Sequence, residues 1–143
     1  MSGLRDIVVK VVTPAASAAL SGNAEPLLHE IASLLEALLA EGRSGTIDLQ
    51  SLPLTPADRD YLRERLGEGE VRAELHALGP SEIRETAYRG VWWVTHRNAD
   101  GELCAELIEV TPLPAILQAE QEEIADAVQR LRADLRDGAA WKP

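Results

Sequence analysis

The stretch from residue 71 to residue 110 constrains the fold of this chain more than any other part of its sequence. Residues 71–77 alternate between apolar and polar side chains, as a strand with one wetted face does. Further strands are predicted over residues 82–88, 91–97 and 102–110, with turns at Gly79-Pro80, Arg89-Gly90 and residues 98–101 between them. Because such short turns join antiparallel neighbours, the stretch predicts an antiparallel meander.

Two helices before the meander are marked by the residues at their ends. Asn23 is expected to cap the first helix, which has a proline in its first turn and ends at Gly42. Thr55 and Asp58 are expected to cap the second helix, which has a proline at its first position and ends at Gly67. A short strand is predicted between them, over residues 46–49. Apolar residues at helical spacing line the first helix: Leu27, Leu28, Ile31, Leu34, Leu35, Leu38 and Leu39.

A third helix is predicted after the meander, from about residue 114 to residue 136. Its buried side is expected to hold Ile116, Leu117, Ile124, Val128, Leu131 and Leu135. This order of elements predicts an α+β fold, with an antiparallel meander sheet and helices packed on one face. A chain of 143 residues has the length of one domain. We therefore expect an N-terminal strand or tail and flexible connection over residues 1–22, a single domain over 23–137, and a tail over 138–143.

The adjacent pair Trp92 and Trp93 must point to opposite faces of the predicted sheet. The four-residue loop at 98–101 favours a register that pairs Trp92 with Leu107 and Trp93 with Glu106. On this register the Trp92 face is more apolar, so it is predicted to be the face that the helices cover. The residues expected to be buried there are Val71, Ala73, Leu75, Ile83, Trp92, Val94, Leu103 and Leu107.

The opposite face of the sheet carries Trp93 among mostly polar neighbours. A large aromatic side chain on an open polar face is typical of a binding anchor. We therefore predict a partner-binding surface made of Trp93, Arg84, Thr86, Thr95 and Glu106. The alternative is that a loop or tail covers Trp93, because half-buried tryptophan is common.

Two polar residues are predicted on the face of Trp92. Glu85 would lie across from Val94 and diagonal to His96, and a buried carboxylate needs a partner. His96 is the expected partner, which makes Glu85 and His96 a polar pair on the core face. A slipped register would instead send Glu85 to water.

The candidate metal ligands and nucleophiles do not form a motif. His29, His76, His96 and Cys104 lack the spacing of a zinc site, so ordinary histidines are expected and no metal site is predicted. Cys104 lies in a predicted strand without a neighbouring base, and there is no G-x-S-x-G sequence or glycine-rich phosphate loop. We therefore expect no catalytic residues and no cofactor.

Charge and hydropathy exclude several classes of partner. The net charge of −10 argues against nucleic acid and against an anionic membrane, since both need a basic surface. No apolar run approaches the roughly 20 residues of a spanning helix, and the first residues lack a signal-peptide pattern. A single cysteine rules out a disulfide within the chain. The expected location is therefore the cytoplasm.

Several segments together resemble a known family. They are 46–49 (TIDL), 52–54 (LPL), 66–71 (LGEGEV), 78–86 (LGPSEIRET), 90–96 (GVWWVTH) and 108–111 (IEVT). This joined pattern resembles the C-terminal domain of the HupH/HyaF hydrogenase expression proteins, over about residues 25–118.

The resemblance implies an accessory, chaperone-like role in the maturation of an uptake nickel–iron hydrogenase. The expected partners are an immature hydrogenase subunit, the iron–sulfur small subunit first, and other maturation proteins. The alternative is an enzyme or metallochaperone that handles a metal or cluster through Glu85, His96 and Cys104. Many members of the family carry more than one such unit, so a homodimer is expected of a chain with one.

Overall fold

The computed structural model of this chain describes residues 19–138, so the strand or tail predicted over residues 4–12 lies outside the described residues. Its contacts divide the chain into two compact units, one ending at Pro112 and one beginning at Leu113. The elements of the first unit are α2 (Ala24–Glu41), β1 (Gly45–Asp48), η1 (Leu49–Ser51), α3 (Pro56–Leu66), β2 (Arg72–His76), β3 (Pro80–Glu85), β4 (Val91–Arg97) and β5 (Leu103–Val110). The second unit holds η2 (Ala115–Leu117) and α4 (Gln121–Arg136).

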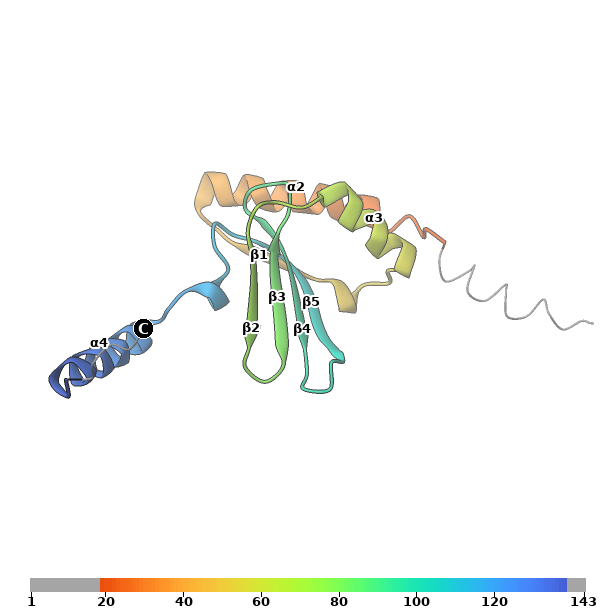
Figure 1. Cartoon of the computed structure of the whole chain (residues 1–143). Coiled ribbons are helices and arrows are strands. Elements are labelled where there is room, and N and C mark those ends of the chain that lie inside the picture. Colours follow the sequence, from red (N-terminus) through yellow and green to blue (C-terminus); the bar gives the residue numbers. More distant parts are fainter. Residues whose placement is uncertain (1–18, 139–143) are drawn as a thin grey trace, which may run out of the picture. The chain divides into compact units, whose positions relative to one another are not determined.

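The predicted meander is confirmed. Strands β2 to β5 pair antiparallel in sequence order, and β1 joins the sheet along β5, which gives the strand order β1-β5-β4-β3-β2 (Figure 1). The β4–β5 register differs from the predicted one, because Trp93 lies opposite Ile108 rather than Glu106. An irregularity between His96 and Arg97 accompanies this shift. The shift is two residues, and a shift of two keeps every side chain on its predicted face.

The helix boundaries of the first unit are also confirmed. Asn23 is the N-cap residue of α2, although its side chain donates to the carbonyl oxygen of Pro53 rather than to the helix. Gly42 ends α2 with a φ of 69°, in the left-handed region that favours glycine. Thr55 and Asp58 form the capping box of α3, and each side chain accepts a hydrogen bond from the other residue's backbone N–H.

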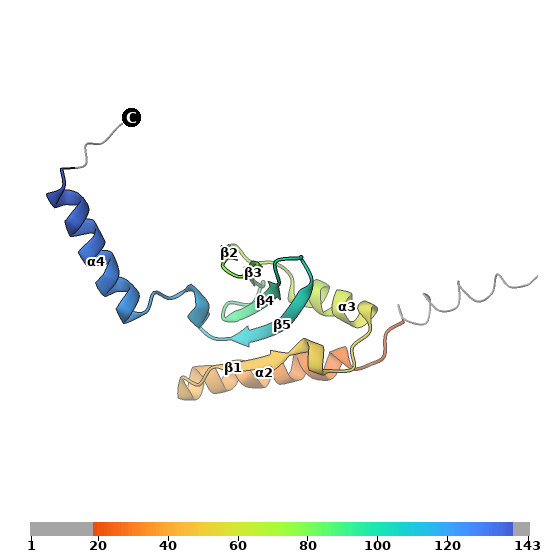
Figure 2. The same cartoon turned by 90° about the horizontal axis from the view of Figure 1, so that it is seen from below.

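Helices α2 and α3 cover the face of the sheet opposite to the predicted one. Leu27 and Ile31 of α2 belong to the same buried cluster as Trp93, and Figure 2 shows α2 running alongside β1. The cluster consists of Ala24, Leu27, Ile31, Ile47, Leu49, Leu62, Leu66, Val91, Trp93, Ile108 and Val110. The prediction was wrong because β4 and β5 carry large apolar residues on both faces. Alternation separates two such faces without showing which of them receives the helices.

The other face of the sheet holds the residues that were predicted to face the helices. Ile83, Trp92 and Val94 are buried there, and the indole N–H of Trp92 donates to the carbonyl oxygen of Thr111 at 3.0 Å. Val71, in contrast, is 45% exposed and lies before β2 begins. The remaining residues of that prediction are half-buried: Ala73, Leu75, Leu103 and Leu107.

The second unit contains the amphipathic helix α4. Glu120 and Glu123 form a capping box at its start. Within the second unit, the residues that were predicted to line its buried side are not buried. Among the described residues, no helix is long and apolar enough to cross a membrane.

Candidate functional site

A buried carboxylate lies where α3 meets the sheet. Glu106 of β5 is 3% exposed. One of its oxygens accepts a hydrogen bond from Arg63 at 3.0 Å and from the indole N–H of Trp93 at 3.1 Å, and the other accepts from Arg59. A buried carboxylate is stable only when charged or polar donors replace its water. This cluster of Glu106, Arg59, Arg63 and Trp93 is therefore internally satisfied.

Trp93 is part of this cluster and is not an exposed anchor. It is 3% exposed, and the guanidinium carbon of Arg63 lies 4.8 Å from the centre of its ring. The open-face prediction for Trp93 was wrong for the reason given above: the helices pack on its side of the sheet. Helices α2 and α3, and not the loop or tail of the alternative prediction, cover Trp93.

Beyond the buried cluster, the surface over β3 and β4 is hollowed. The larger hollow has a volume of about 570 Å³ and is lined by Arg63, Glu74, Pro80, Ser81, Glu82, Arg84, Thr95 and Arg97. A smaller hollow of about 70 Å³ is lined by Arg63, Gly67, Glu68, Arg84, Glu85, Thr86 and Trp93. Arg63 and Arg84 line both hollows, and we call this surface the Arg63–Arg84 groove.

The groove is lined by arginines and glutamates together: Arg63, Arg84, Arg97, Glu68, Glu74, Glu82 and Glu85. The pKa of Arg63 is lowered by its partial burial and by the nearby charge of Arg84. Arg84 has only loose ion pairs, at 3.6 Å to Glu82 and 4.0 Å to Glu68. Glu82 is held more closely by Arg72, and this hydrogen bond raises the pKa of Arg72. Arg63 is already bound to Glu106 at 3.0 Å, so Arg84 is the guanidinium of the groove that an incoming carboxylate would pair with.

The structure brings together the five residues predicted for partner binding, but in a different setting. Arg84 and Thr95 line the larger hollow, Thr86 and Trp93 line the smaller one, and Glu106 lies in the buried cluster behind them. The sequence analysis missed Arg59 and Arg63 of α3. Their spacing of four residues places both on one side of the helix, but only the packed structure shows that this side faces the sheet.

The predicted Glu85–His96 pair does not form. Glu85 lies opposite Trp92 at the end of β3, where it accepts hydrogen bonds from the backbone N–H of Glu70 at 3.2 Å and from Arg89 at 2.9 Å. His96 lies at the other end of β4, and its Nδ1 is 2.7 Å from the hydroxyl oxygen of Ser81. Glu85 and His96 do share a face, but the register places them four residue pairs apart along the ladder.

The remaining candidate ligands are also separate. Cys104 is exposed and is the unpaired residue at the irregularity between β4 and β5, where His96 pairs with Ala105 and Arg97 with Leu103. His29 lies on α2 and His76 ends β2 at the edge of the sheet. Within residues 19–138, no three His, Cys, Asp or Glu side chains are grouped so that they could hold a metal ion.

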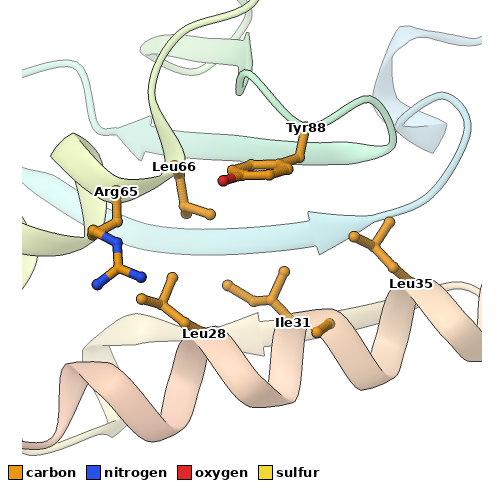
Figure 3. Close-up of a pocket in the computed structure, with 7 residues that line it drawn as sticks. Leu28, Ile31, Leu35, Arg65, Leu66 and Tyr88 are labelled. Carbon is orange, nitrogen blue, oxygen red and sulfur yellow. The ribbon is translucent and has the colours of Figure 1, made fainter.

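A second, apolar hollow lies on the other side of the C-terminal end of α3. It has a volume of about 210 Å³ and is lined by Leu28, Ile31, Ala32, Leu35, Arg65, Leu66 and Tyr88. Figure 3 shows Leu28, Ile31 and Leu35 of α2 pointing toward Leu66 and Tyr88 across this hollow. Tyr88 is 54% exposed, so the hollow opens to the surface beside it. The end of α3 therefore separates a charged concave surface from an apolar one.

Comparison with known proteins gives consistent matches. A family model described as HupH hydrogenase expression protein, C-terminal conserved region, matches residues 22–137. The chain is similar to a solved structure, the hydrogenase expression protein HupH from Thiobacillus denitrificans ATCC 25259, with a TM-score of 0.81 and 47% identity. That match covers 83% of this chain and 99% of the solved one.

Curated relatives match over a similar region. The hydrogenase expression/formation protein HoxQ of Azotobacter vinelandii is 38% identical over 112 residues, which are 77% of this chain and 40% of HoxQ. The hydrogenase-1 operon protein HyaF of Escherichia coli (strain K12) is 30% identical over 109 residues, 76% of this chain and 38% of HyaF. The chain thus spans about two fifths of the length of these relatives.

Proposed function

Because this chain belongs to the family of HupH hydrogenase expression proteins, we propose that it is an accessory protein for the maturation of a nickel–iron hydrogenase. It acts by binding an immature hydrogenase subunit, the iron–sulfur small subunit first, and not by catalysis. It works in the cytoplasm, together with other maturation proteins. The names of the relatives, which describe hydrogenase expression and formation, support the process in which we place it.

The observation that carries the binding role is the Arg63–Arg84 groove. A concave surface in which the guanidinium of Arg84 is only loosely paired suits an extended or loop segment that presents a carboxylate. Thr95 also lines the groove and adds a hydroxyl group. The nearby hollow with Leu28 and Tyr88 would take an apolar side chain of the same partner. Charge then orients the partner, while apolar burial supplies most of the affinity.

The experiment is a capture assay with the purified full chain as bait. The iron–sulfur small subunit and the large subunit are expressed separately and offered to it in turn. We expect the small subunit to be retained. Arg84→Glu is expected to weaken retention at least tenfold, because it replaces attraction for a carboxylate by repulsion in a concave site.

Arg43→Glu is the matched control for this assay. Arg43 has the same charge, is exposed and lies just before β1, at the edge of the sheet opposite to β2. It should leave retention unchanged, and both variants should keep the unfolding midpoint of the parent chain. Equal retention by Arg84→Glu and the parent would remove the groove from the binding surface. Retention of neither subunit would overturn the binding function itself.

A metallochaperone or enzyme is the competing function, and it would use Glu85, His96 and Cys104 together. Glu85 is separated from His96 along the sheet, and no group of three such ligands forms among the described residues, so geometry gives that function no support. A measurement of iron and nickel in the chain purified from hydrogenase-expressing cells distinguishes the two. A stoichiometric metal content that Cys104→Ser or His96→Ala abolishes would favour the competing function.

A further inference from the structure

Strand β2 forms an edge of the sheet in the first unit. It is the last strand in the order β1-β5-β4-β3-β2, and within residues 19–138 no other strand pairs with its outer side. The strand at the other edge, β1, has only four residues, and α2 runs alongside it (Figure 2). A helix bonds its own backbone groups internally, so only a further extended segment can pair with the edge of β2.

A hydrogen bond at the start of β2 shows which of its residues face outward. The backbone N–H of Glu85 in β3 donates to the carbonyl oxygen of Val71 at 2.9 Å, so Val71 faces β3. Successive residues of a strand direct their backbone groups to opposite sides, and the odd-numbered residues of β2 therefore face β3 as well. The residues whose N–H and C=O groups point away from the sheet are Arg72, Glu74 and His76.

The side chains of β2 favour one particular pairing of two such edges. In an antiparallel pair, outward-facing residues lie opposite each other and exchange hydrogen bonds. One register places Arg72 opposite Glu74 of a second copy, and two-fold symmetry makes this contact twice. A shift by two residues in either direction would instead place Glu74 opposite Glu74, or Arg72 opposite Arg72. The edge of β2 is therefore complementary to itself in a single register.

The charged neighbours of this edge agree with the register. Arg72 already donates to Glu82 of its own chain through Nε and one terminal nitrogen, which leaves its other terminal nitrogen for a second carboxylate. The same register brings His76 near Glu70 of the second copy, just beyond the strand. Like charges are therefore not placed opposite each other along the pair.

The apolar residues of β2 agree with it as well. Ala73 comes to lie on the two-fold axis opposite Ala73 of the second copy, and its small side chain leaves room for the two strands to approach. Leu75 comes to lie opposite Val71, which is 45% exposed in the single chain. Pairing therefore covers apolar surface on one face of the sheet and joins opposite charges on the other.

We propose that two copies of this chain associate through an antiparallel pair of their β2 strands, with Ala73 on the two-fold axis. The two sheets then form one continuous sheet, and both Arg63–Arg84 grooves open on the same face of it. Because residues 71–75 of each copy make the main contact, the interface is small. The dimer is therefore a weak one, with a dissociation constant in the micromolar range.

The first test is sedimentation velocity of the full chain from about 5 µM to about 500 µM, a span that covers weak association. We expect a monomer–dimer equilibrium. Glu74→Pro removes an outward N–H that β3 does not use, so it should raise the dissociation constant at least tenfold and keep the unfolding midpoint of the parent. A parent chain that stays monomeric, or an unchanged dissociation constant in Glu74→Pro, overturns the proposal.

The register is tested by reversing charges. Arg72→Glu and Glu74→Arg each place like charges opposite each other, so each variant alone should associate at least tenfold more weakly than the parent. A mixture of the two variants should associate as the parent does, because one copy then carries two carboxylates and the other two guanidinium groups. Damage to β2 within each chain would persist in the mixture, so failure of the mixture to recover overturns the proposal. Arg43→Glu is the control and should change nothing.

Cross-linking gives an independent measure of the register, in a Cys104→Ser background because Cys104 is exposed. Under oxidation, Ala73→Cys should link to itself, because residues opposite each other in such a pair have Cα atoms about 4.5 Å apart, within disulfide range. Leu75→Cys should link to Val71→Cys and not to itself. Self-linking of Leu75→Cys without self-linking of Ala73→Cys overturns the proposed pair. None of these measurements involves a hydrogenase subunit, so their outcome is independent of the proposed function.

Discussion

Glu106 and Trp93 connect α3 to the sheet at the scale of single residues. Glu106 and Trp93 belong to neighbouring strands, while Arg59 and Arg63 come from α3. These hydrogen bonds replace the ones that the charged and polar groups of the cluster would make with water if they were exposed. The position of α3 is therefore tied to a particular register of β4 and β5. Arg63 has one side in the cluster and the other in the Arg63–Arg84 groove.

Replacement of Trp93 tests this cluster. Trp93→Ala should lower the free energy of unfolding by about 3 kcal/mol or more, because it leaves a cavity under the helices and removes a donor from Glu106. Trp93→Phe keeps most of the ring and loses the indole N–H, so it should cost less, about 1–2 kcal/mol. Chemical denaturation of the three proteins measures both values. A loss below about 1 kcal/mol for Trp93→Ala would mean that its burial contributes little.

At the scale of elements, the start of α3 is held by Asp58. Its buried carboxylate accepts hydrogen bonds from the backbone N–H and the hydroxyl of Ser21 and from the backbone N–H of Thr55. Thr55 in turn donates to the carbonyl oxygen of Ala19. One side chain thus caps α3 and ties the segment before α2 to it. At the other end of α3, Gly69 lets the chain approach β3 closely, since a Cβ there would lie 2.4 Å from the carbonyl oxygen of Thr86.

The Asp58 cap predicts a particular dependence of stability on pH. Burial by itself raises the pKa of Asp58, but the hydrogen bonds from Ser21 and Thr55 outweigh it and lower the pKa from 3.8 to about 2. A carboxylate whose pKa is lowered in the folded state stabilises the fold fully when the pH is above its pKa in the unfolded chain. Its contribution is lost as the pH falls from about 4 toward 2.

The measurement compares the parent chain with Asp58→Asn by denaturation between pH 6 and pH 2.5. The parent should be more stable by about 1–2 kcal/mol at pH 6, and the difference should shrink below pH 4. Ser51→Ala serves as the control. It removes a hydroxyl that donates to the carbonyl oxygen of Asp48, and its effect on stability should not depend on pH in this range. A difference that stays constant over this range would contradict the role of the Asp58 charge.

At the scale of the whole molecule, the first unit holds the buried core and the Arg63–Arg84 groove, and the second holds helix α4. The surface proposed for partner binding therefore lies entirely in the first unit.

Truncation tests whether the first unit folds without α4. A chain that ends at Gln118 lacks α4, in which no residue is buried. It should keep the free energy of unfolding of the full chain to within about 1 kcal/mol. Leu62→Ala, a change in the core of the first unit, should cost about 2–5 kcal/mol and shows that the assay is sensitive. A loss of that size on truncation would show that α4 is part of the fold of the first unit.

The sequence by itself determined the elements, their order and the grouping of side chains by face. The capping residues Thr55 and Asp58, the glycine at position 42 and the turns of the meander act over a few residues, so local chemistry is enough to locate them. The grouping of Trp93 with Arg84 and Thr95 also followed from alternation alone, because it depends only on odd and even spacing.

Only the tertiary structure decided which face of the sheet the helices cover. Trp92 and Trp93 offer similar apolar area on opposite faces, so the choice depends on how the stripe of α2 and the arginines of α3 fit each face. The same packing separated Glu85 from His96 and gave each another partner. Local patterns do not show how the helices pack on the sheet, because that packing joins residues far apart in the chain, such as Arg63 and Glu106, which are 43 positions apart.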